Sequence, residues 1–291
     1  MTKQAKENTK NDFSTQGNQR KTGLEQHYTT PMIAEFCTQK FFDLVDSRDA
    51  GMVLEPCAGT GEFSRQILKF TDYLDEMDID PKIGMRRGDF LDFNFYGGMA
   101  FSVITNPPFG RGNSLSVKFF NHAASAKANY IGFLIPASWR KWSLQNKLDK
   151  NYHLIGDFDL PAGTHFYELG VEDNKETTLS CVFQVWEWRK EERERVIVPD
   201  NGFVIKSTPE EADIQLVTNG WSLGKVNIDF DRGKKVNGTR YYKLGKEGVL
   251  NTLLNLKETD AYSKFTKNNA YVKSISFDEL NYLLNERMHS N

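Results

Sequence analysis

The chain has 291 residues, of which 39% are hydrophobic and 13% aromatic, enough for one large α/β domain or for such a domain with a smaller partner. Its 37 basic and 39 acidic residues nearly cancel, which excludes a protein that binds nucleic acid through its overall charge and leaves only a local basic surface. The three cysteines lie far apart, which predicts neither a disulfide framework nor a metal site. The chain has no apolar run of about 18 residues and no secretory signal, so we expect a soluble cytoplasmic protein without a membrane partner.

Polar residues dominate the first part of the chain. Residues 1–20 contain a single phenylalanine among mainly Lys, Gln, Asn, Thr and Ser. They bury too little apolar surface to offset the entropy of ordering, so we expect a disordered tail. From Pro31 the apolar residues recur at helical spacing, which predicts an amphipathic helix. Those residues are Ile33, Phe36, Cys37, Phe41, Phe42 and Val45.

Short apolar runs then alternate with helical patterns. A buried strand is predicted at 52–54, followed by a glycine loop and a helix through Phe63. Strands that alternate with helices predict an α/β fold with a mainly parallel sheet and helices on both faces. Further strands are predicted at 74–79, 100–105, 130–135 and 179–186, with a helix at 115–126.

A dense run of charges at 189–195 has no apolar residue and is interpreted as a solvated connector or a helix end. We place a domain boundary there, with the main domain over 21–190 and an extension over 191–291. The extension has short β-like runs at 202–205 and 214–217. It closes with a helical pattern over 277–288, so a smaller α+β region is predicted after the main domain.

The most informative motif is Asn106-Pro107-Pro108-Phe109, which follows an apolar strand pattern. Two successive prolines fix φ near −65° and supply no N–H. The Asn106 amide oxygen and the Pro107 carbonyl can therefore accept from the same –NH2 group, while Phe109 stacks on the attached ring. This is an arrangement for methylating an amino nitrogen.

A glycine loop follows the first strand, in the stretch Glu55-Pro56-Cys57-Ala58-Gly59-Thr60-Gly61. Gly59 and Gly61 allow the backbone to approach a ligand at a helix N-terminus. Glu55 would repel phosphates, and it suits the cationic amino-acid end of S-adenosylmethionine better. A tight βα turn without a ligand is an equal interpretation of the loop alone.

Acidic residues follow the next strands. Asp78 or Asp80 is placed to accept two hydrogen bonds from a ribose diol. Asp89 is a candidate acceptor for an adenine amino group, with Phe90 against the ring, although a turn cap explains Asp89 equally well. Because these residues recur at successive strand ends, we expect them along one edge of the sheet.

Residues 23–188 resemble the S-adenosylmethionine-dependent amino-methyltransferases of the DNA N6-adenine type, and within them a stand-alone group found in phage and other mobile elements. The motifs that carry the resemblance include 23–31, 54–61, Asn106 to Phe109, 133–139 and 181–186. The family's usual first glycine is replaced here by Cys57.

The resemblance implies a Rossmann-like methyltransferase fold and assigns roles residue by residue. Tyr28 and Thr30 would touch the methionine part of the donor, and the loop from Glu55 through Cys57, Ala58 and Gly59 to Gly61 would hold it. Asp78 would bind the ribose, Asp89 and Phe90 the adenine, and the Asn106 motif the target amine.

The implied reaction is methyl transfer to adenine N6 in double-stranded DNA, with the base flipped into the Asn106 pocket. Phe166, in a late loop, is a candidate to pack on the flipped base together with Phe109, with core packing as its alternative. The C-terminal region would recognise the target, as in a restriction–modification system.

Candidate DNA contacts are local. The segment 232–246 has six basic residues, no acidic ones and paired tyrosines, which suits a loop that follows phosphates, although a solvated hairpin is the alternative. Its candidates are Arg232, Lys234, Lys235, Arg240 and Lys243. Arg111 lies beside the Asn106 motif, and Arg140 and Lys141 follow a predicted strand.

Two other kinds of function fit the same motifs. Asn-Pro-Pro-aromatic also serves enzymes that methylate adenine N6 or guanine N2 in RNA, or a glutamine amide in protein, because all present a planar –NH2 group. A non-catalytic accessory protein that binds the donor and DNA is the second alternative, which the intact Asn106 and donor loop disfavour.

Overall fold

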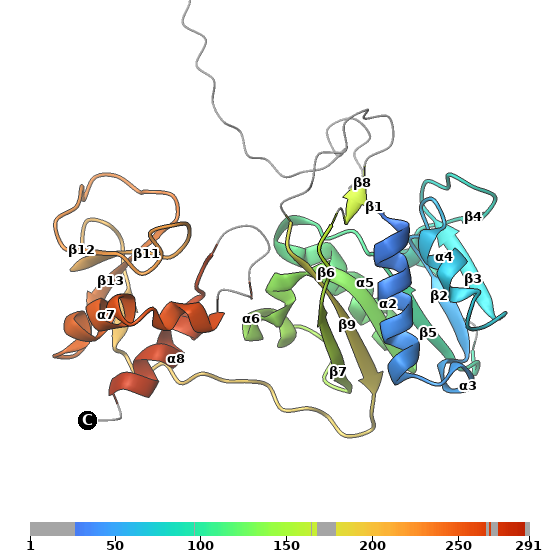
Figure 1. Ribbon diagram of the computed structural model, residues 1–291. Coiled ribbons are helices and arrows are strands. Elements are labelled where there is room, and N and C mark those ends of the chain that lie inside the picture. The colour runs from blue at the N-terminus through green and yellow to red at the C-terminus, as the bar shows by residue number, and fades with distance from the viewer. Residues whose placement is uncertain are drawn as a thin grey trace, which may run out of the picture.

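The computed structural model describes residues 27–95, 97–163, 165–167, 179–265, 268 and 273–288. The tail expected at 1–20 lies outside these residues. A large α/β part holds a seven-stranded sheet, and a smaller α+β part follows it at the C-terminus (Figure 1).

The first described elements are the short strand β1 (Tyr28–Thr29) and helix α2 (Pro31–Leu44). Pro31 occupies the first helical position, where the missing N–H costs nothing. Ile33, Cys37 and Phe41 are buried at helical spacing, which confirms the predicted amphipathic helix. The short helix α3 (Ser47–Ala50) follows, capped by Asp46.

The seven-stranded sheet has the order β4-β3-β2-β5-β6-β9-β7. The first five strands in this order are parallel, whereas β9 runs antiparallel to both of its neighbours. The strands are β2 (Met52–Glu55), β3 (Leu74–Asp78), β4 (Arg86–Arg87), β5 (Phe101–Thr105), β6 (Tyr130–Pro136), β7 (Tyr152–Asp159) and β9 (Cys181–Trp188). The predicted Rossmann-like, mainly parallel sheet is confirmed, with the late strand β9 antiparallel to its neighbours.

Helices cover both faces of the sheet. Helix α2 and helix α4 (Glu62–Ile67) contribute to one buried cluster, and helix α5 (Ser114–Ser125) contributes to the other. Along β5, Val103 belongs to the α5 cluster and the next residue, Ile104, to the α2 cluster. This alternation is what a strand buried on both faces requires.

The C-terminal part has an antiparallel sheet with the order β10-β13-β11-β12 and its own apolar core, which confirms the expected α+β region. Buried Leu216 on the sheet and buried Leu253 and Leu284 on the helices belong to this core. The elements are β10 (Val204–Lys206), β11 (Ile214–Val217), β12 (Val226–Asn227), β13 (Thr239–Leu244), α7 (Val249–Glu258) and α8 (Phe277–Met288).

Two sets of contacts attach the connector and the C-terminal part. The Arg193 guanidinium donates to the carbonyls of Tyr152 (2.9 Å) and Gln145 (2.6 Å), so the charged run is anchored and not wholly solvated. The Trp142 ring packs on Tyr282, with ring centroids 5.3 Å apart. Short helical segments complete the chain, α6 (Trp142–Gln145) and the 3-10 turns η1 (Phe90–Asp92), η2 (Arg111–Asn113), η3 (Ala137–Arg140) and η4 (Ala261–Phe265).

Within the described part of the chain, no helix is long and apolar enough to cross a membrane. The same residues contain no group of three or more His, Cys, Asp or Glu side chains placed to hold a metal ion.

Candidate active site

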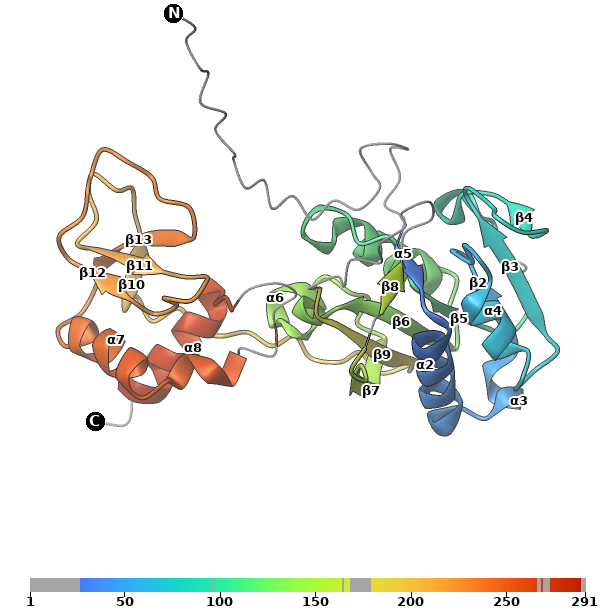
Figure 2. The same ribbon diagram turned by 45° about the horizontal axis from the view of Figure 1, so that its top comes forward.

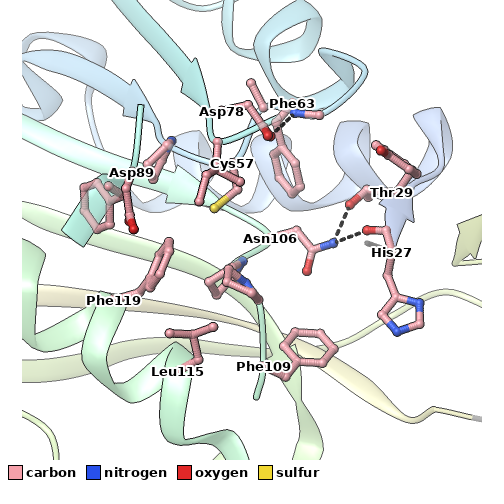
Figure 3. A pocket seen from close by; sticks show the side chains of 18 of the residues that line it. His27, Thr29, Cys57, Phe63, Asp78, Asp89, Asn106, Phe109, Leu115 and Phe119 are labelled. Carbon is pink, nitrogen blue, oxygen red and sulfur yellow. Dashed lines mark hydrogen bonds between the residues drawn. The ribbon is translucent and has the colours of Figure 1, made fainter. Parts of the chain in front are cut away.

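A cavity of about 240 Å³ lies at the carboxyl ends of β2, β3 and β5 (Figure 3). Parallel strands place their carboxyl ends on one edge, where open α/β sheets bind ligands. Several of the predicted site residues are brought together here, namely Tyr28, Cys57, Ala58, Gly59, Asp78, Asp89, Phe90, Asn106, Pro107, Pro108 and Phe109.

The Asn106 side chain is held in one orientation. Its Nδ2 donates to the His27 carbonyl at 2.9 Å and to Thr29 Oγ1 at 3.1 Å. Because both donor hydrogens are used, Oδ1 is the end that remains, and it is buried without a hydrogen-bond partner among the described residues. A buried acceptor without a partner costs roughly 1–3 kcal/mol, which a ligand amine in the cavity would recover.

The loop after Asn106 is fixed by the helix that follows it. The Phe109 carbonyl accepts from the backbone N–H groups of Leu115 (3.1 Å) and Ser116 (3.3 Å) at the start of α5. Gly110 has φ +68°, and a Cβ there would lie 2.8 Å from the Leu115 Cβ, so the turn needs glycine. Phe109 is therefore held at the cavity wall, only 5% exposed, with its ring nearly parallel to that of His27 at 6.5 Å.

Asp78, and not Asp80, lines the cavity. Its Oδ2 accepts from the Gly59 N–H at 2.8 Å and its Oδ1 from the Asp80 N–H at 2.7 Å, leaving a further lone pair on each oxygen for a ligand. The Asp80 carboxylate instead pairs with Lys82 at 2.5 Å. Sequence spacing left these two residues open, and the structure places only Asp78 in the cavity lining.

The two loop glycines have different roles. Gly59 lines the cavity at φ +53°, and a Cβ there would come within 3.0 Å of the Tyr28 ring. Gly61 caps helix α4 at φ +82° and lies outside the lining residues. Only Gly59 therefore brings backbone to the cavity, while Gly61 makes the turn.

Glu55 is not at the cavity surface. It is fully buried, and its Oε1 accepts from the Cys57 N–H at 3.0 Å and from Thr105 Oγ1 at 2.5 Å. Burial raises the pKa of Glu55 to about 8, so its carboxyl is mostly protonated at neutral pH. The expected contact with a cationic ligand is not supported, because Glu55 instead joins the ends of β2 and β5.

Asp89 is the turn cap that the sequence offered as one alternative, and it also lines the cavity. Its Oδ1 accepts from the Leu91 N–H at 2.9 Å, which caps η1, and the residue also lines the cavity. Phe90, 2% exposed, packs against Phe119 of α5 at 5.1 Å between ring centroids. These residues form an apolar slot with a carboxylate at its edge.

The β1 side of the cavity is held by pairing with strand β8 (Phe166–Tyr167), which aligns Tyr28 with Tyr167. Burial and the nearby carboxylates of Asp78 and Asp80 raise the pKa of Tyr28 to about 12, so its hydroxyl stays protonated. Thr29 lines the cavity, whereas Thr30 is the N-cap of α2 and lies outside the lining. The predicted contact of Thr30 with a donor in this cavity is therefore not supported.

Phe166 is a core residue. It is 1% exposed, is paired with Thr29 across β1 and β8, and belongs to the α2 cluster. The predicted contact with a flipped base is not supported, and the core alternative holds.

Sequence reasoning missed several lining residues, including His27, Thr29, Phe63, Leu115 and Phe119. Spacing would have found some of them. Leu115 and Phe119 are four residues apart on helix α5, so they share a face.

The basic residues expected near the site differ in what they contact. Arg140 pairs with Asp157 at 2.8 Å and with Asp159 at 2.7 Å. Lys141 Nζ donates to Ser274 Oγ at 3.0 Å, and burial lowers its pKa. Phosphate contacts by these two residues are therefore not supported, whereas Arg111 is exposed beside the Asn106 loop.

The basic C-terminal segment is also mixed. Lys234, Lys235 and Arg240 are exposed. Arg232 lies 4.8 Å from the Phe230 ring centroid, and Lys243 pairs with Glu211 at 2.9 Å. The paired tyrosines are internal, since Tyr241 is 7% and Tyr242 2% exposed. The exposed cations, and not the tyrosines, are available to a partner.

No protein-family profile and no curated protein sequence matches the chain. Similar solved structures include a Pyrococcus horikoshii protein assigned as an RNA methyltransferase, with 17% identity and a TM-score of 0.42 over 57% of this chain and 88% of that one. A Listeria monocytogenes protein assigned as a class I S-adenosylmethionine-dependent methyltransferase has 16% identity and a TM-score of 0.42 over 60% of this chain and 64% of that one. A Thermoplasma acidophilum protein has 15% identity and a TM-score of 0.41 over 58% of this chain and 93% of that one.

The cavity combines features that suit two neighbouring ligand groups. At one end, Asp78, Asp89 and the slot beside Phe90 offer carboxylate acceptors next to an apolar wall. At the other, Asn106 Oδ1 is an oriented acceptor beside an aromatic ring. A nucleoside and a planar amine fit these two ends of one cavity.

Proposed function

We propose that the chain is a methyltransferase that transfers a methyl group from S-adenosylmethionine to the N6 amino group of adenine in DNA. The observation that carries this proposal is the buried Asn106 Oδ1, an acceptor fixed by two hydrogen bonds from its own amide nitrogen and left without a partner among the described residues. A target –NH2 group is the donor that it lacks.

The residues at the β2 and β3 ends fit the nucleoside part of this donor. Asp78 would accept from the ribose hydroxyls, with Gly59 allowing close approach. Asp89 would accept from the adenine amino group and Phe90 would lie against the ring. Tyr28 would lie along the methionine part. When bound, S-adenosylmethionine supplies a methyl group on a sulfonium sulfur, and this sulfur becomes a thioether when the methyl group is transferred.

The chain's own residues would act on the target nitrogen. Conjugation with the adenine ring makes N6 a poor nucleophile. Asn106 Oδ1 and the Pro107 carbonyl would each accept a hydrogen bond from one of the two N6 hydrogens. These hydrogen bonds would favour a tetrahedral nitrogen whose lone pair forms the new N–C bond. One N6 proton is then released to solvent. Catalysis is positioning and electrostatics, without a strong base acting first.

DNA is the proposed substrate because a flipped base needs an aromatic ring to stack on and cations that hold the surrounding phosphates. The α/β part offers the ring, and the C-terminal part offers the cations. Flipping costs a few kcal/mol, which stacking on Phe109 would partly offset. Exposed Lys234, Lys235 and Arg240 would contact phosphates, with Arg111 nearer the cavity. In both views the long loop between β12 and β13 rises at the top of the C-terminal part (Figures 1 and 2). In Figure 1, β1 lies on that same side of the molecule, and its residues Tyr28 and Thr29 line the cavity.

The proposal is tested by expressing the chain in methylation-deficient cells and sequencing their genomic DNA by a long-read method that detects modified bases. Adenine methylation at one short motif is expected, and Asn106→Ala should leave the DNA unmodified. An unmodified genome, with the wild-type protein folded and the donor bound, contradicts DNA as the substrate and directs the same assay to RNA.

A further inference from the structure

Trp221 is the most exposed large apolar side chain among the described residues. Its exposed fraction is 98%, whereas the only other tryptophan among the exposed side chains, Trp188, is at 38%. It lies in the loop between β11 and β12. A tryptophan presented wholly to water gains nothing from the protein's own packing, and tryptophan is enriched among residues that dominate binding.

The loop that carries Trp221 is built as a rigid support. Its ends are closed by the Gly224 N–H donating to the Val217 carbonyl at 2.9 Å, and inside it the Leu223 N–H donates to the Gly220 carbonyl at 3.2 Å. Leu223 is 5% exposed in the C-terminal core, so the loop is anchored two residues after Trp221.

The base of the loop is also tied to its neighbours. The Gly220 N–H donates to the Lys273 carbonyl at 2.8 Å, and the Thr218 N–H donates to the Gly238 carbonyl at 2.8 Å. The turn that carries Trp221 is therefore fixed by hydrogen bonds at its base, and the indole ring projects from it into solvent.

The surroundings of this turn are cationic. Lys225, Arg240 and Lys273 are exposed on the segments bonded to it or paired with it. Between Trp221 and Lys246 the sequence has seven basic residues and two acidic ones, a local charge of 7 − 2 = +5, in a chain whose net charge is −2. An exposed aromatic ring among cations matches a polyanion that carries stackable rings, which is a nucleic acid.

We infer that Trp221 is an aromatic contact to DNA, stacking on or wedging against bases while Lys225, Arg240 and Lys273 contact phosphates on either side. This inference rests on the proposed function for its choice of DNA and extends it from the cavity to the recognition surface. Apolar and aromatic side chains that enter a groove in this way bend or unstack the duplex, which would assist the flipping of a nearby base.

The test measures DNA binding without turnover. The anisotropy of a short fluorescein-labelled duplex is titrated with the wild-type protein, Trp221→Ala, Trp221→Tyr and the control Tyr73→Ala. Tyr73 is 74% exposed and precedes β3, at the edge of the sheet opposite the cavity. The duplex carries the methylated motif found by sequencing, or a random sequence if none is found. Melting temperatures confirm that each variant is folded.

Trp221→Ala should raise the dissociation constant for the duplex by about tenfold, the effect of losing one aromatic stack. Trp221→Tyr should recover most of the affinity, and Tyr73→Ala should stay within about twofold of wild type. Binding of the duplex should also protect Trp221 from acrylamide quenching. Calorimetric donor affinity should not change in Trp221→Ala.

An unchanged dissociation constant in Trp221→Ala, or a wild-type protein that does not bind the duplex, overturns the inference. The outcome is separable from that of the proposed function. Weaker duplex binding by Trp221→Ala in a protein that methylates no DNA keeps this inference and rejects the function. Adenine methylation with unchanged duplex binding keeps the function and rejects this inference.

Discussion

The cavity and the C-terminal surface differ in how they hold the side chains to which a function is assigned. In the cavity, Asn106 and Asp78 are fixed by backbone atoms of neighbouring segments, the His27 carbonyl and the Gly59 N–H. On the C-terminal surface, Trp221 and Lys234 are open to solvent. Substitutions in the two regions should therefore have separate effects. Those in the cavity should impair donor binding or the chemical step, and those on the C-terminal surface should lower the affinity for DNA.

Asn106→Ala should produce the largest effect. Removing Oδ1 removes the acceptor for the target amine, so methyl transfer should fall by about a thousandfold. Donor affinity should change by less than about threefold, because the ribose and adenine contacts remain. Transfer of a radiolabelled methyl group and calorimetric titration of the donor measure the two quantities. Equal loss of both would contradict the separation of the two regions, because Asn106 would then be a donor ligand first.

Glu55→Gln should change stability and its dependence on pH. The folded pKa of about 8 exceeds the ordinary value of 4.5, so between these values the folded protein holds a proton that the unfolded chain has lost. The free energy of unfolding of wild type therefore falls as the pH rises from about 4.5 to about 8 and levels off above. Over this pH range, the free energy of unfolding of Glu55→Gln should therefore rise relative to that of wild type by on the order of a few kcal/mol.

Denaturant titrations of Glu55→Gln and wild type at several pH values measure this difference. Parallel stability curves for the two proteins would show that Glu55 does not titrate between these pH values, and that burial between β2 and β5 does not raise its pKa.

Asp78→Asn should weaken donor binding by about thirtyfold, because a charge-assisted hydrogen bond is worth roughly 1.5–3 kcal/mol. Asp80→Asn is the matched control, the same residue type two positions away with its carboxylate on Lys82 and outside the cavity lining. The control should bind the donor within about twofold of wild type. Similar losses in both variants would place the ribose elsewhere.

Thr29→Val removes one of the two acceptors that hold the Asn106 amide, while the His27 carbonyl remains. Turnover should fall by about tenfold because the oriented amide becomes less ordered. Donor affinity should be retained. Thr30→Val, one residue later and outside the cavity lining, should turn over within about twofold of wild type. Steady-state turnover at saturating donor and DNA separates the two, and equal rates would exclude Thr29 as a positioning residue.

Lys234→Ala should have the smallest effect, confined to DNA. Affinity for duplexes should fall by a few-fold without regard to sequence, and the slope of log affinity against log salt should decrease by about one. Lys69→Ala is the control, an exposed lysine that pairs with Glu35 at 3.2 Å in the α/β part. A salt slope that does not change in Lys234→Ala would remove this lysine from the DNA surface.

Much of the fold could be predicted because its signals are local. The buried runs of β2, β5 and β6 and the periodic helices α2 and α5 are readable within a dozen residues. The direction of β9 and the presence of β7 were not. Strand direction depends on the path between strands. The edge strand β7 has no clean alternation, because a bulge shifts its register between Leu154 and Gly156 and because Gly156 and Asp157 are residues that strands disfavour.

The candidate site was predictable where function depends on the strand end itself, as for Asp78 and Asn106. It was not predictable where the orientation of a side chain decides whether that side chain reaches the cavity. Glu55 ends a strand as Asp78 does, yet its side chain points into the sheet interior. Thr29 rather than Thr30 lines the cavity because β1 pairs with β8, a strand more than a hundred residues away. Likewise Arg140 is neutralised by Asp157 and Asp159 on a strand that was not predicted.

Transfer to adenine N6 is tested most directly by nucleoside mass spectrometry of DNA incubated with the purified protein and S-adenosylmethionine carrying a deuterated methyl group. We expect deuterated N6-methyldeoxyadenosine with the wild-type protein and none with Asn106→Ala. Label found only in methylcytosine, or in no nucleoside although the donor binds, would contradict transfer to adenine N6 in DNA.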